Sequence, residues 1–543
     1  MNRKPIAWAG VLVVTLTCSA FAAQAFVGGT VKSLGGTLRL TVSVGSGATA
    51  RDQSFKLTPG TKVTLDGKPA KIEDLGAGVK VTVSYDKDSN EVATIRATSG
   101  KPGEITDPPA KTSKSEKPAT TSGSGTKSFK SKKSDAESVT LSNAAAGEWP
   151  QFRGPNRDGI STDTGLLREW PSDGPRLAWK ADGLGRSFSS VAVAGGRVYT
   201  MGKVGNAEEI IALDGRDGRK LWSTPIGRGR GKGGGMPGPR CTPTVDGDLV
   251  YGIGIDGDIA CVEAATGNLV WKKSFESDFG GRMMSGWGFS ESPLIDGDKV
   301  ICTPGGDRAT MVALNKKSGQ TIWQAAGGRA NGAGYASPVV AEVGGVRQYL
   351  TLVGAGLISV ASRDGKVLWT YDKIANGTAN CPTPVVINDL VFCSTGYDTG
   401  AALLKISGRG GDSRADEQYF LRARDFQNHH GGFVVVDGHV YGGSGNNNGL
   451  PTCLDLRSGK AAWGPSRGPG SGSASVCYAD GHVYFRYEGG DVALIEATPS
   501  RMNVKSTFRP PVSTPSWSHP AVTGGRLYIR DQEQLLCYDV KGS

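Results

Sequence analysis

From about residue 147 onward, one pattern of apolar and polar positions recurs along the chain. Each copy is an apolar run, a tight turn and a second apolar run, as in "VAGGRVY", "VDGDLVY" and "IDGDKVI". Asp-Gly and Gly-Gly between β-rich runs predict hairpins, because Gly accepts the positive φ that such turns require. The pattern occurs eight times, with a longer version at 343–350.

A second phrase follows most of the hairpins and places a Gly four residues before a Trp. It reads "EAATGNLVW" at 263–271, and close variants stand at 214–222 and 315–323. The Gly lets the chain turn tightly into a last strand, and the indole is flat and large enough to fill the space between packed sheets. We therefore expect a structural docking role for Trp179, Trp222, Trp271, Trp323, Trp369 and Trp463. Two repeats lack the Trp, and Phe420 and Phe508 are expected to replace it.

Together the two phrases predict a repeat of four antiparallel strands and roughly 45–50 residues, which is typical of a β-propeller blade. The last hairpin is followed by "QLLCYDV" and no further Trp strand, whereas "PRLAWKADG" precedes the first hairpin. We expect the strand around Trp179 to complete the last blade. The predicted fold of 147–543 is therefore an all-β, eight-bladed propeller.

The first 146 residues differ from the repeats. Residues 1–25 resemble a signal peptide, with basic residues, the apolar run "IAWAGVLVVTLT" and the small residues "AQA" for cleavage after Ala25. Cys18 lacks the small preceding residue expected at a lipidation site. We therefore expect an exported protein, periplasmic or extracellular, without a transmembrane segment after cleavage.

Residues 26–98 alternate apolar and polar side chains over short runs, which predicts a small β-barrel or sandwich. Residues 99–146 are rich in Lys, Ser, Thr and Pro and predict a disordered linker, because they offer little apolar area to bury. The linker's Lys cluster is a candidate contact for an anionic surface.

The composition argues against two classes of function, nucleic-acid binding and thiol or zinc chemistry. The formal net charge is +11, but 62 basic and 51 acidic side chains are both abundant, and nucleic-acid binding is not expected. The nine Cys residues form no C-x-x-C motif, so a thiol redox or zinc site is not indicated. Cysteine pairing stays open.

The Gly-to-Trp phrases resemble the tryptophan-docking motif of the PQQ-like, quinoprotein-type β-propeller family, and "EWPQFRGPNRDGIS" is similar to the start of its export-targeted members. The resemblance implies the propeller fold for about residues 149–540. It implies two kinds of function. Some members are alcohol or sugar dehydrogenases that hold PQQ and Ca²⁺ in the funnel, and others, such as the propeller lipoprotein of outer-membrane protein assembly, are interaction scaffolds without a cofactor.

Equivalent points on the blades should ring one mouth of the funnel, namely the residues before each innermost strand. They form a polar and aromatic collar that is a candidate ligand site: Arg240, Glu291, Tyr335, Asn380, His429, His430, Trp517 and His519. Glu291 and Asn380 carry the oxygen atoms that Ca²⁺ prefers. We find no third ligand, no catalytic base and no adjacent Cys pair of the kind that the quinoprotein dehydrogenases carry.

The sequence thus favours a non-catalytic scaffold of the cell envelope that binds a protein or a small ligand and uses no cofactor or metal. The first alternative is a PQQ- and Ca²⁺-dependent alcohol or sugar dehydrogenase. The second is a glycan-binding module that uses Tyr335 and Trp517.

Overall fold

The computed structural model describes most of the chain in two compact units, 1–129 and 130–543. The described residues are 24–35, 39–44, 51–65, 68–75, 79–86, 91–98 and 144–542 except 231–235, 237, 327–329, 410, 513–514 and 516. The predicted signal peptide, apart from its last two residues, and the predicted linker, apart from 144–146, lie outside them.

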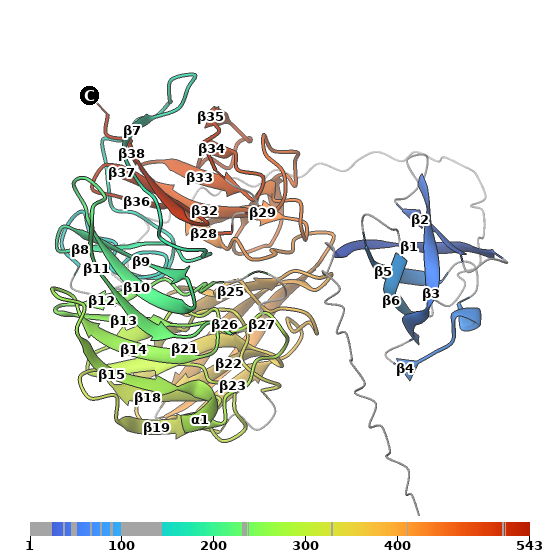
Figure 1. Ribbon diagram of the computed structural model, residues 1–543, viewed down its shortest axis with the longest axis horizontal. Coiled ribbons are helices and arrows are strands. Elements are labelled where there is room, and N and C mark those ends of the chain that lie inside the picture. The colour runs from blue at the N-terminus through green and yellow to red at the C-terminus, as the bar shows by residue number, and fades with distance from the viewer. Residues whose placement is uncertain are drawn as a thin grey trace, which may run out of the picture. The chain divides into compact units, whose positions relative to one another are not determined.

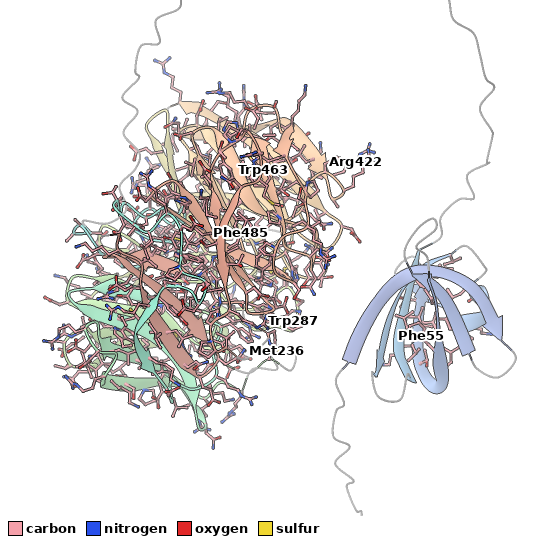
Figure 2. All side chains as sticks on the ribbon, turned by 90° about the horizontal axis from the view of Figure 1, so that it is seen from above. Phe55, Met236, Trp287, Arg422, Trp463 and Phe485 are labelled. Atoms are coloured by element: carbon pink, nitrogen blue, oxygen red, sulfur yellow. The ribbon has the colours of Figure 1, made fainter. Side chains whose placement is uncertain are left out.

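The N-terminal unit is one sheet with strand order β2-β1-β5-β6-β3-β4, in which β2 also pairs with β3. Its elements are β1 (Gln24–Gly35), β2 (Arg39–Val44), β3 (Arg51–Leu65), β4 (Lys68–Pro69), the 3₁₀ helix η2 (Ile72–Asp74), β5 (Lys80–Asp86) and β6 (Glu91–Thr98). Alternate apolar residues of the strands form its core, including Val42, Phe55 (labelled in Figure 2) and Ile95. The choice between a barrel and a sandwich stays a prediction.

The second unit is an all-β propeller of eight four-stranded antiparallel blades, as the repeats predict (Figure 1). Blades 1 to 4 comprise β8 (Ala192–Ala194), β9 (Arg197–Val204), β10 (Ala207–Asp214) and β11 (Lys220–Gly227); β12 (Thr244–Asp246), β13 (Leu249–Ile253), β14 (Asp258–Glu263) and β15 (Leu269–Ser274); β16 (Leu294–Asp296), β17 (Lys299–Cys302), β18 (Met311–Asn315) and β19 (Thr321–Ala325); and β20 (Val339–Val343), β21 (Val346–Val353), β22 (Gly356–Ala361) and β23 (Val367–Tyr371). The short helix α1 (Phe275–Phe279) follows β15.

Blades 5 to 8 follow in chain order. They comprise β24 (Val385–Ile387), β25 (Leu390–Thr395), β26 (Gly400–Arg409) and β27 (Asp412–Arg422); β28 (Phe433–Val436), β29 (His439–Ser444), β30 (Leu450–Asp455) and β31 (Ala461–Trp463); β32 (Ala474–Ala479), β33 (His482–Tyr487), β34 (Val492–Glu496) and β35 (Val504–Phe508); and β36 (Ala521–Thr523), β37 (Arg526–Asp531), β38 (Gln534–Asp539) and β7 (Arg176–Ala181).

The position of each strand in its blade explains its apolar pattern. The two middle strands of blade 2, β13 and β14, are almost wholly buried, because neighbouring blades cover both of their faces. The outermost strand, β15, buries Trp271 and exposes Leu269 and Val270. The apolar hairpins are therefore the inner part of each blade, and the Trp strand is its outer edge.

The ring closes through the two ends of the propeller sequence. Strand β7 pairs antiparallel with β38, and Trp179 lies opposite Cys537 (Figure 1). This is the pairing that the count of hairpins predicts. Because β7 precedes blade 1 in the chain, it ties the last blade to the first.

Indole N–H groups join consecutive blades at the outer edge. Trp271 Nε1 donates to the carbonyl oxygen of Lys316 in the next blade at 2.9 Å, and the indole covers Gly319, whose φ is +70°. A Cβ at Gly319 would stand 2.8 Å from the ring. The Gly of the repeat phrase therefore has a second role besides the turn: it leaves room for the indole of the preceding blade. The same bond to the next blade is made by Trp179, Trp222, Trp323 and Trp463.

Blade 4 docks differently. Trp369 Nε1 donates at 2.9 Å to Gln348 Oε1 in its own blade. The next blade carries the long hairpin β26–β27 in place of the short Gly turn, so the usual carbonyl acceptor is missing there.

The expected replacement of Trp by Phe420 is wrong by one residue. Tyr419 takes the docking position: it pairs with Leu403 beside a register shift, as Trp271 pairs with Cys261 beside the same shift in blade 2. Its hydroxyl donates to the carbonyl oxygen of Leu456 in blade 6 at 2.8 Å, and its ring lies against Gly459.

In blade 7, Phe508 is buried between the blades, but it does not act alone. Trp170, from the segment before β7, packs its ring 5.1 Å from that of Phe508 and 5.7 Å from that of Tyr484. The backbone N–H of Trp170 donates to Ser506 Oγ. The indole of Trp170, which lies outside the repeat, therefore fills the space that the missing docking Trp would leave at blade 7.

Candidate functional site

The segment 149–161, which we call the axial segment, crosses the end of the propeller axis. Its backbone or side chains bond to the innermost strands, or to the residues just before them, in blades on both sides of the ring. Arg157 donates to the carbonyl oxygen of Ser292 in blade 3 at 2.6 Å, and Arg153 donates to that of Phe433 in blade 6 at 2.5 Å. Further backbone bonds reach Val193, Val245 and Tyr478 in blades 1, 2 and 7.

Above the axial segment lies a cavity of about 200 Å³, which we call the axial cavity. Phe152 and Arg153 of the axial segment form its floor. Its walls come from the residues that precede the innermost strands and from one turn of blade 5: Phe188, Ser190, Arg240, Thr242, Trp287, Ser290, Tyr335, Ser337, Ala379, Cys381, Thr383, Tyr397, His429, His430, Gly432, Trp517 and His519. The cavity is therefore a funnel with one closed end.

A ring of hydroxyl groups fixes the wall. Each hydroxyl lies two residues before an innermost strand and accepts the backbone N–H of the equivalent residue in the preceding blade. Thr242, Ser292, Ser337 and Thr383 accept in this way at 2.9–3.1 Å. These bonds lock blades 1 to 5 to one another where they meet the axis.

Aromatic rings form a continuous arc around the cavity. Trp517 stacks on Phe188, with ring centroids 4.5 Å apart and planes 22° apart. The ring of His430 lies 5.5 Å from that of Trp517, and the ring of His429 lies 4.5 Å from that of His430. Arg240 extends the arc beyond Phe188, with its guanidinium carbon 5.5 Å from the ring centroid. The wall thus offers flat apolar faces and one cation.

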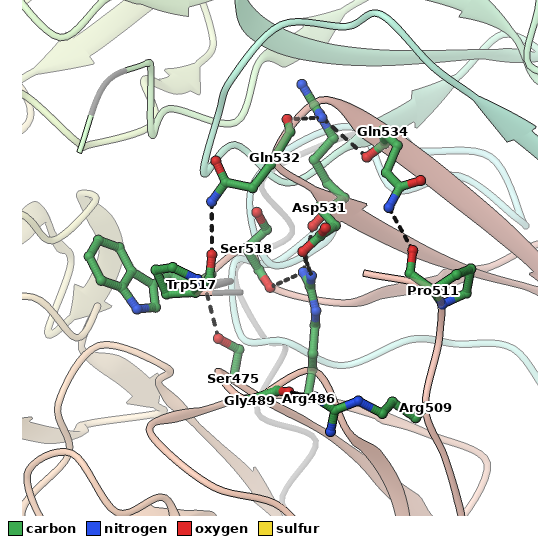
Figure 3. Close-up of polar contacts among 12 residues, drawn as sticks. Ser475, Arg486, Gly489, Arg509, Pro511, Trp517, Ser518, Asp531, Gln532 and Gln534 are labelled. Atoms are coloured by element: carbon green, nitrogen blue, oxygen red, sulfur yellow. Dashed lines mark hydrogen bonds and ion pairs between the residues drawn. The ribbon is translucent and has the colours of Figure 1, made fainter. Parts of the chain in front are cut away.

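The loop that carries Trp517 is held by polar contacts from blades 7 and 8 (Figure 3). Ser475 Oγ donates to the carbonyl oxygen of Trp517 at 3.3 Å, and Arg486 donates to that of Ser518 at 3.0 Å. Arg486 also forms a fully buried ion pair with Asp531, at 3.3 Å. The position of the indole is therefore set by the scaffold beneath it.

The three histidines of the cavity are neutral. Burial lowers the pKa of His429 to about 4 and that of His519 to about 3, and burial together with the two neighbouring imidazoles lowers the pKa of His430 well below its usual value. His429 Nδ1 lies 2.6 Å from Ser473 Oγ, and its Nε2 lies 2.9 Å from the Tyr397 hydroxyl. Both ring nitrogens of His429 are thus already engaged.

The charge of the cavity is positive. Arg153 and Arg240 contribute to it, and no Asp or Glu stands among the described residues that line it. Arg153 is almost fully buried, and it donates hydrogen bonds to the backbone carbonyl groups of Arg157, Asp158 and Phe433. Burial lowers its pKa to about 10, which leaves the guanidinium charged at neutral pH.

Six of the eight candidate residues from the sequence line the cavity: Arg240, Tyr335, His429, His430, Trp517 and His519. The other two lie outside the lining. Glu291 is buried and accepts the backbone N–H of Thr303 at 2.6 Å, and burial raises its pKa to about 7. The amide of Asn380 donates to the Val353 carbonyl and accepts the Asn376 N–H.

Sequence reasoning missed the floor and part of the wall. Phe152 and Arg153 lie in a segment without repeat character, so no periodic signal placed them at the axis. Phe188 and Cys381 stand at the same distance before their innermost strands as Tyr335, so the rule that found Tyr335 also applies to them, whereas Trp287 lies further from its strand.

Whether the cavity could hold a Ca²⁺-bound quinone depends on the oxygen ligands that its lining residues offer. Ca²⁺ binds six to eight oxygen ligands, mostly carboxylates and amide or backbone carbonyls. The described lining residues include no Asp, Glu, Asn or Gln, and Glu291 and Asn380 are engaged outside the lining. Nowhere in the described part of the chain do three His, Cys, Asp or Glu side chains gather as a metal site. The residues present do not fit that group.

Residues 206–465 match the family model described as "Outer membrane protein assembly factor BamB". This match confirms the resemblance of the propeller to PQQ-like propellers. No curated protein sequence matches the chain. None of the helices in the described ranges has the length and apolar character needed to span a bilayer.

Solved structures of two kinds share the fold. BamB from Moraxella catarrhalis is 14% identical, with a TM-score of 0.50, over 67% of this chain and 99% of that one. The quinohemoprotein alcohol dehydrogenase ADHIIG from Pseudomonas putida HK5 is 15% identical, with a TM-score of 0.53, over 75% and 83%. The quinohemoprotein alcohol dehydrogenase from Comamonas testosteroni is 15% identical, with a TM-score of 0.53, over 74% of this chain and 82% of that one. At this identity the likeness concerns the fold alone and leaves the use of a cofactor open.

Proposed function

We propose that the protein is an exported, cofactor-free propeller that binds a ligand or a partner's side chain in the axial cavity. In this proposal it serves the cell envelope as a binding scaffold and performs no redox chemistry. The signal-like N-terminus and the BamB family match support the envelope location.

One observation carries the proposal, namely the combination of an aromatic funnel closed at one end with the lack of carboxylates among its described lining residues. A concave apolar site with a few convergent polar groups is the usual form of a ligand site. Oxidation of an alcohol would need a base for the hydroxyl proton and an electrophile beside the acceptor. Of the histidines in the wall, His429 already bonds through both ring nitrogens, and burial lowers the pKa of His430 and His519, which makes them weak bases.

The experiment compares capture by the full-length protein and by variants of the cavity. Tagged wild type, Trp517→Leu and Arg240→Gln are each incubated with envelope extract, and bound proteins and small molecules are identified by mass spectrometry. Arg422→Gln is the matched control, because Arg422 is exposed and Figure 2 places it at the outer edge of the propeller.

A component retained by wild type and by Arg422→Gln, but lost from both cavity variants, would support the proposal. Equal retention by all four proteins would contradict the assignment of binding to the cavity. Thermal melting of each variant checks that it is folded.

A further inference from the structure

We infer that the axial cavity binds the anion of a small organic acid built on a single aromatic ring. The inference rests on the proposed function of the cavity as a binding site, and it names the chemical class of the ligand. It follows from the size of the cavity, the shape of its wall and the sign of its charge.

The size of the cavity favours one ring. A cavity of about 150 Å³ in another protein interior holds benzene, and pockets for drug-sized molecules begin near 300 Å³. The axial cavity, at about 200 Å³, lies between these values. It has room for a six-membered ring with one small substituent.

The wall favours a flat ring over an aliphatic chain. Trp517 and Phe188 stack almost in parallel, and the His430 ring continues the surface at 5.5 Å from Trp517. Aromatic faces gain from offset or edge-on contact with another ring beyond the area that they bury. A bare inorganic anion would leave these faces unused.

The charge of the site favours an anion. The Arg240 guanidinium lines the wall, and Arg153 forms part of the floor, with its Nη1 against Gly432. That Nη1 atom is buried and has no hydrogen-bond partner in the described part of the chain. The Asp158 carboxylate lies near Arg153 and partly offsets its charge, but it is not among the residues that line the cavity.

An anion in the cavity would offset the cost of holding these guanidinium groups out of water. Arg240 is only partly buried, so a ligand in the cavity can contact it directly, whereas the buried Arg153 acts mainly through its charge in the floor. Glu208 is the acidic residue with the strongest electrostatic effect on Arg240. Burial raises the pKa of Glu208 to about 7, so at neutral pH this carboxyl group is only partly charged and offsets the charge of Arg240 only in part.

The test uses benzoate and its neutral isostere benzamide as probes, with isothermal calorimetry on the full-length protein at neutral pH. Benzoate is expected to bind at least tenfold more tightly than benzamide. Arg240→Gln should remove this preference, Arg240→Lys should keep part of it because the charge remains, and Arg422→Gln should leave it unchanged. Trp517→Leu should weaken both probes.

Equal affinities for benzoate and benzamide would overturn the inference and leave the cavity standing as a binding site. The absence of binding by both probes would overturn the inference as well. In that case the proposed function still depends on the capture experiment, in which the cavity variants decide the outcome without reference to any aromatic acid.

Discussion

Single indole rings connect the blades, and Trp271 is typical of them. Its side chain is 9% exposed and bonds to the next blade, so Trp271→Ala should lower the free energy of unfolding by about 3–5 kcal/mol, as deletion of a buried aromatic does. Denaturant unfolding followed by circular dichroism measures this loss. Leu269→Ala, two residues away and 53% exposed, is the control. A loss below about 1 kcal/mol for Trp271→Ala would show that the ring is not part of the core.

The buried acid Glu208 gives a pH prediction. Its pKa is raised from 4.5 to about 7, mainly by burial and to a smaller extent by Asp256, against the lowering effect of the bond from Ile255 N–H and of the charges of Lys203 and Arg240. The folded protein therefore keeps a proton that the unfolded chain has already lost. The stability from this group is complete below about pH 4.5 and is lost as the pH rises through about 7.

Glu208→Gln removes this titration, so the variant should gain stability relative to wild type between about pH 5 and about pH 8. The measurement is the difference in melting temperature between the two proteins at each pH, with Glu209→Gln as the control on the same strand. A difference that does not change with pH would contradict the assignment.

At the scale of elements, closure of the ring depends on β7. A chain that starts at residue 186 lacks β7 and the axial segment, which leaves the edge of β38 unpaired. We expect it to aggregate, whereas a chain that starts at residue 144 keeps both elements and should stay monodisperse. Light scattering after size-exclusion chromatography distinguishes the two, and equal behaviour of both chains would contradict this role of β7.

The same scale shows what the sequence could predict. Blade number and closure follow from repeated turns and from one orphan strand, because each repeat marks itself with local signals. The docking of Tyr419 depends on its pairing with Leu403 across the long hairpin β26–β27, which lacks the Gly-to-Trp spacing. The filling of the blade 7 gap by Trp170 depends on a contact between segments about 340 residues apart. Neither event leaves a local signal in the sequence.

At the scale of the whole molecule, the funnel combines repeated and unique parts. Tyr335 and Trp517 could be placed at its mouth because equivalent positions of blades meet around one axis. The floor could not be predicted in this way. Arg153 and Arg157 hold the axial segment through bonds to backbone carbonyl groups, and every residue has such a group, so the sequence does not indicate which ones are bound. The propeller repeat thus predicts the wall of the site, and the axial segment closes one end of the funnel.

The central claim is that this cavity works without a quinone, and one titration tests it most directly. The full-length protein is titrated with PQQ in the presence of Ca²⁺ by calorimetry, and dye reduction is then followed with a panel of alcohols and aldose sugars. The account predicts no PQQ binding and no turnover that depends on an alcohol or a sugar. Micromolar or tighter PQQ binding, with alcohol-dependent dye reduction that Glu291→Gln abolishes, would contradict it and establish an oxidoreductase.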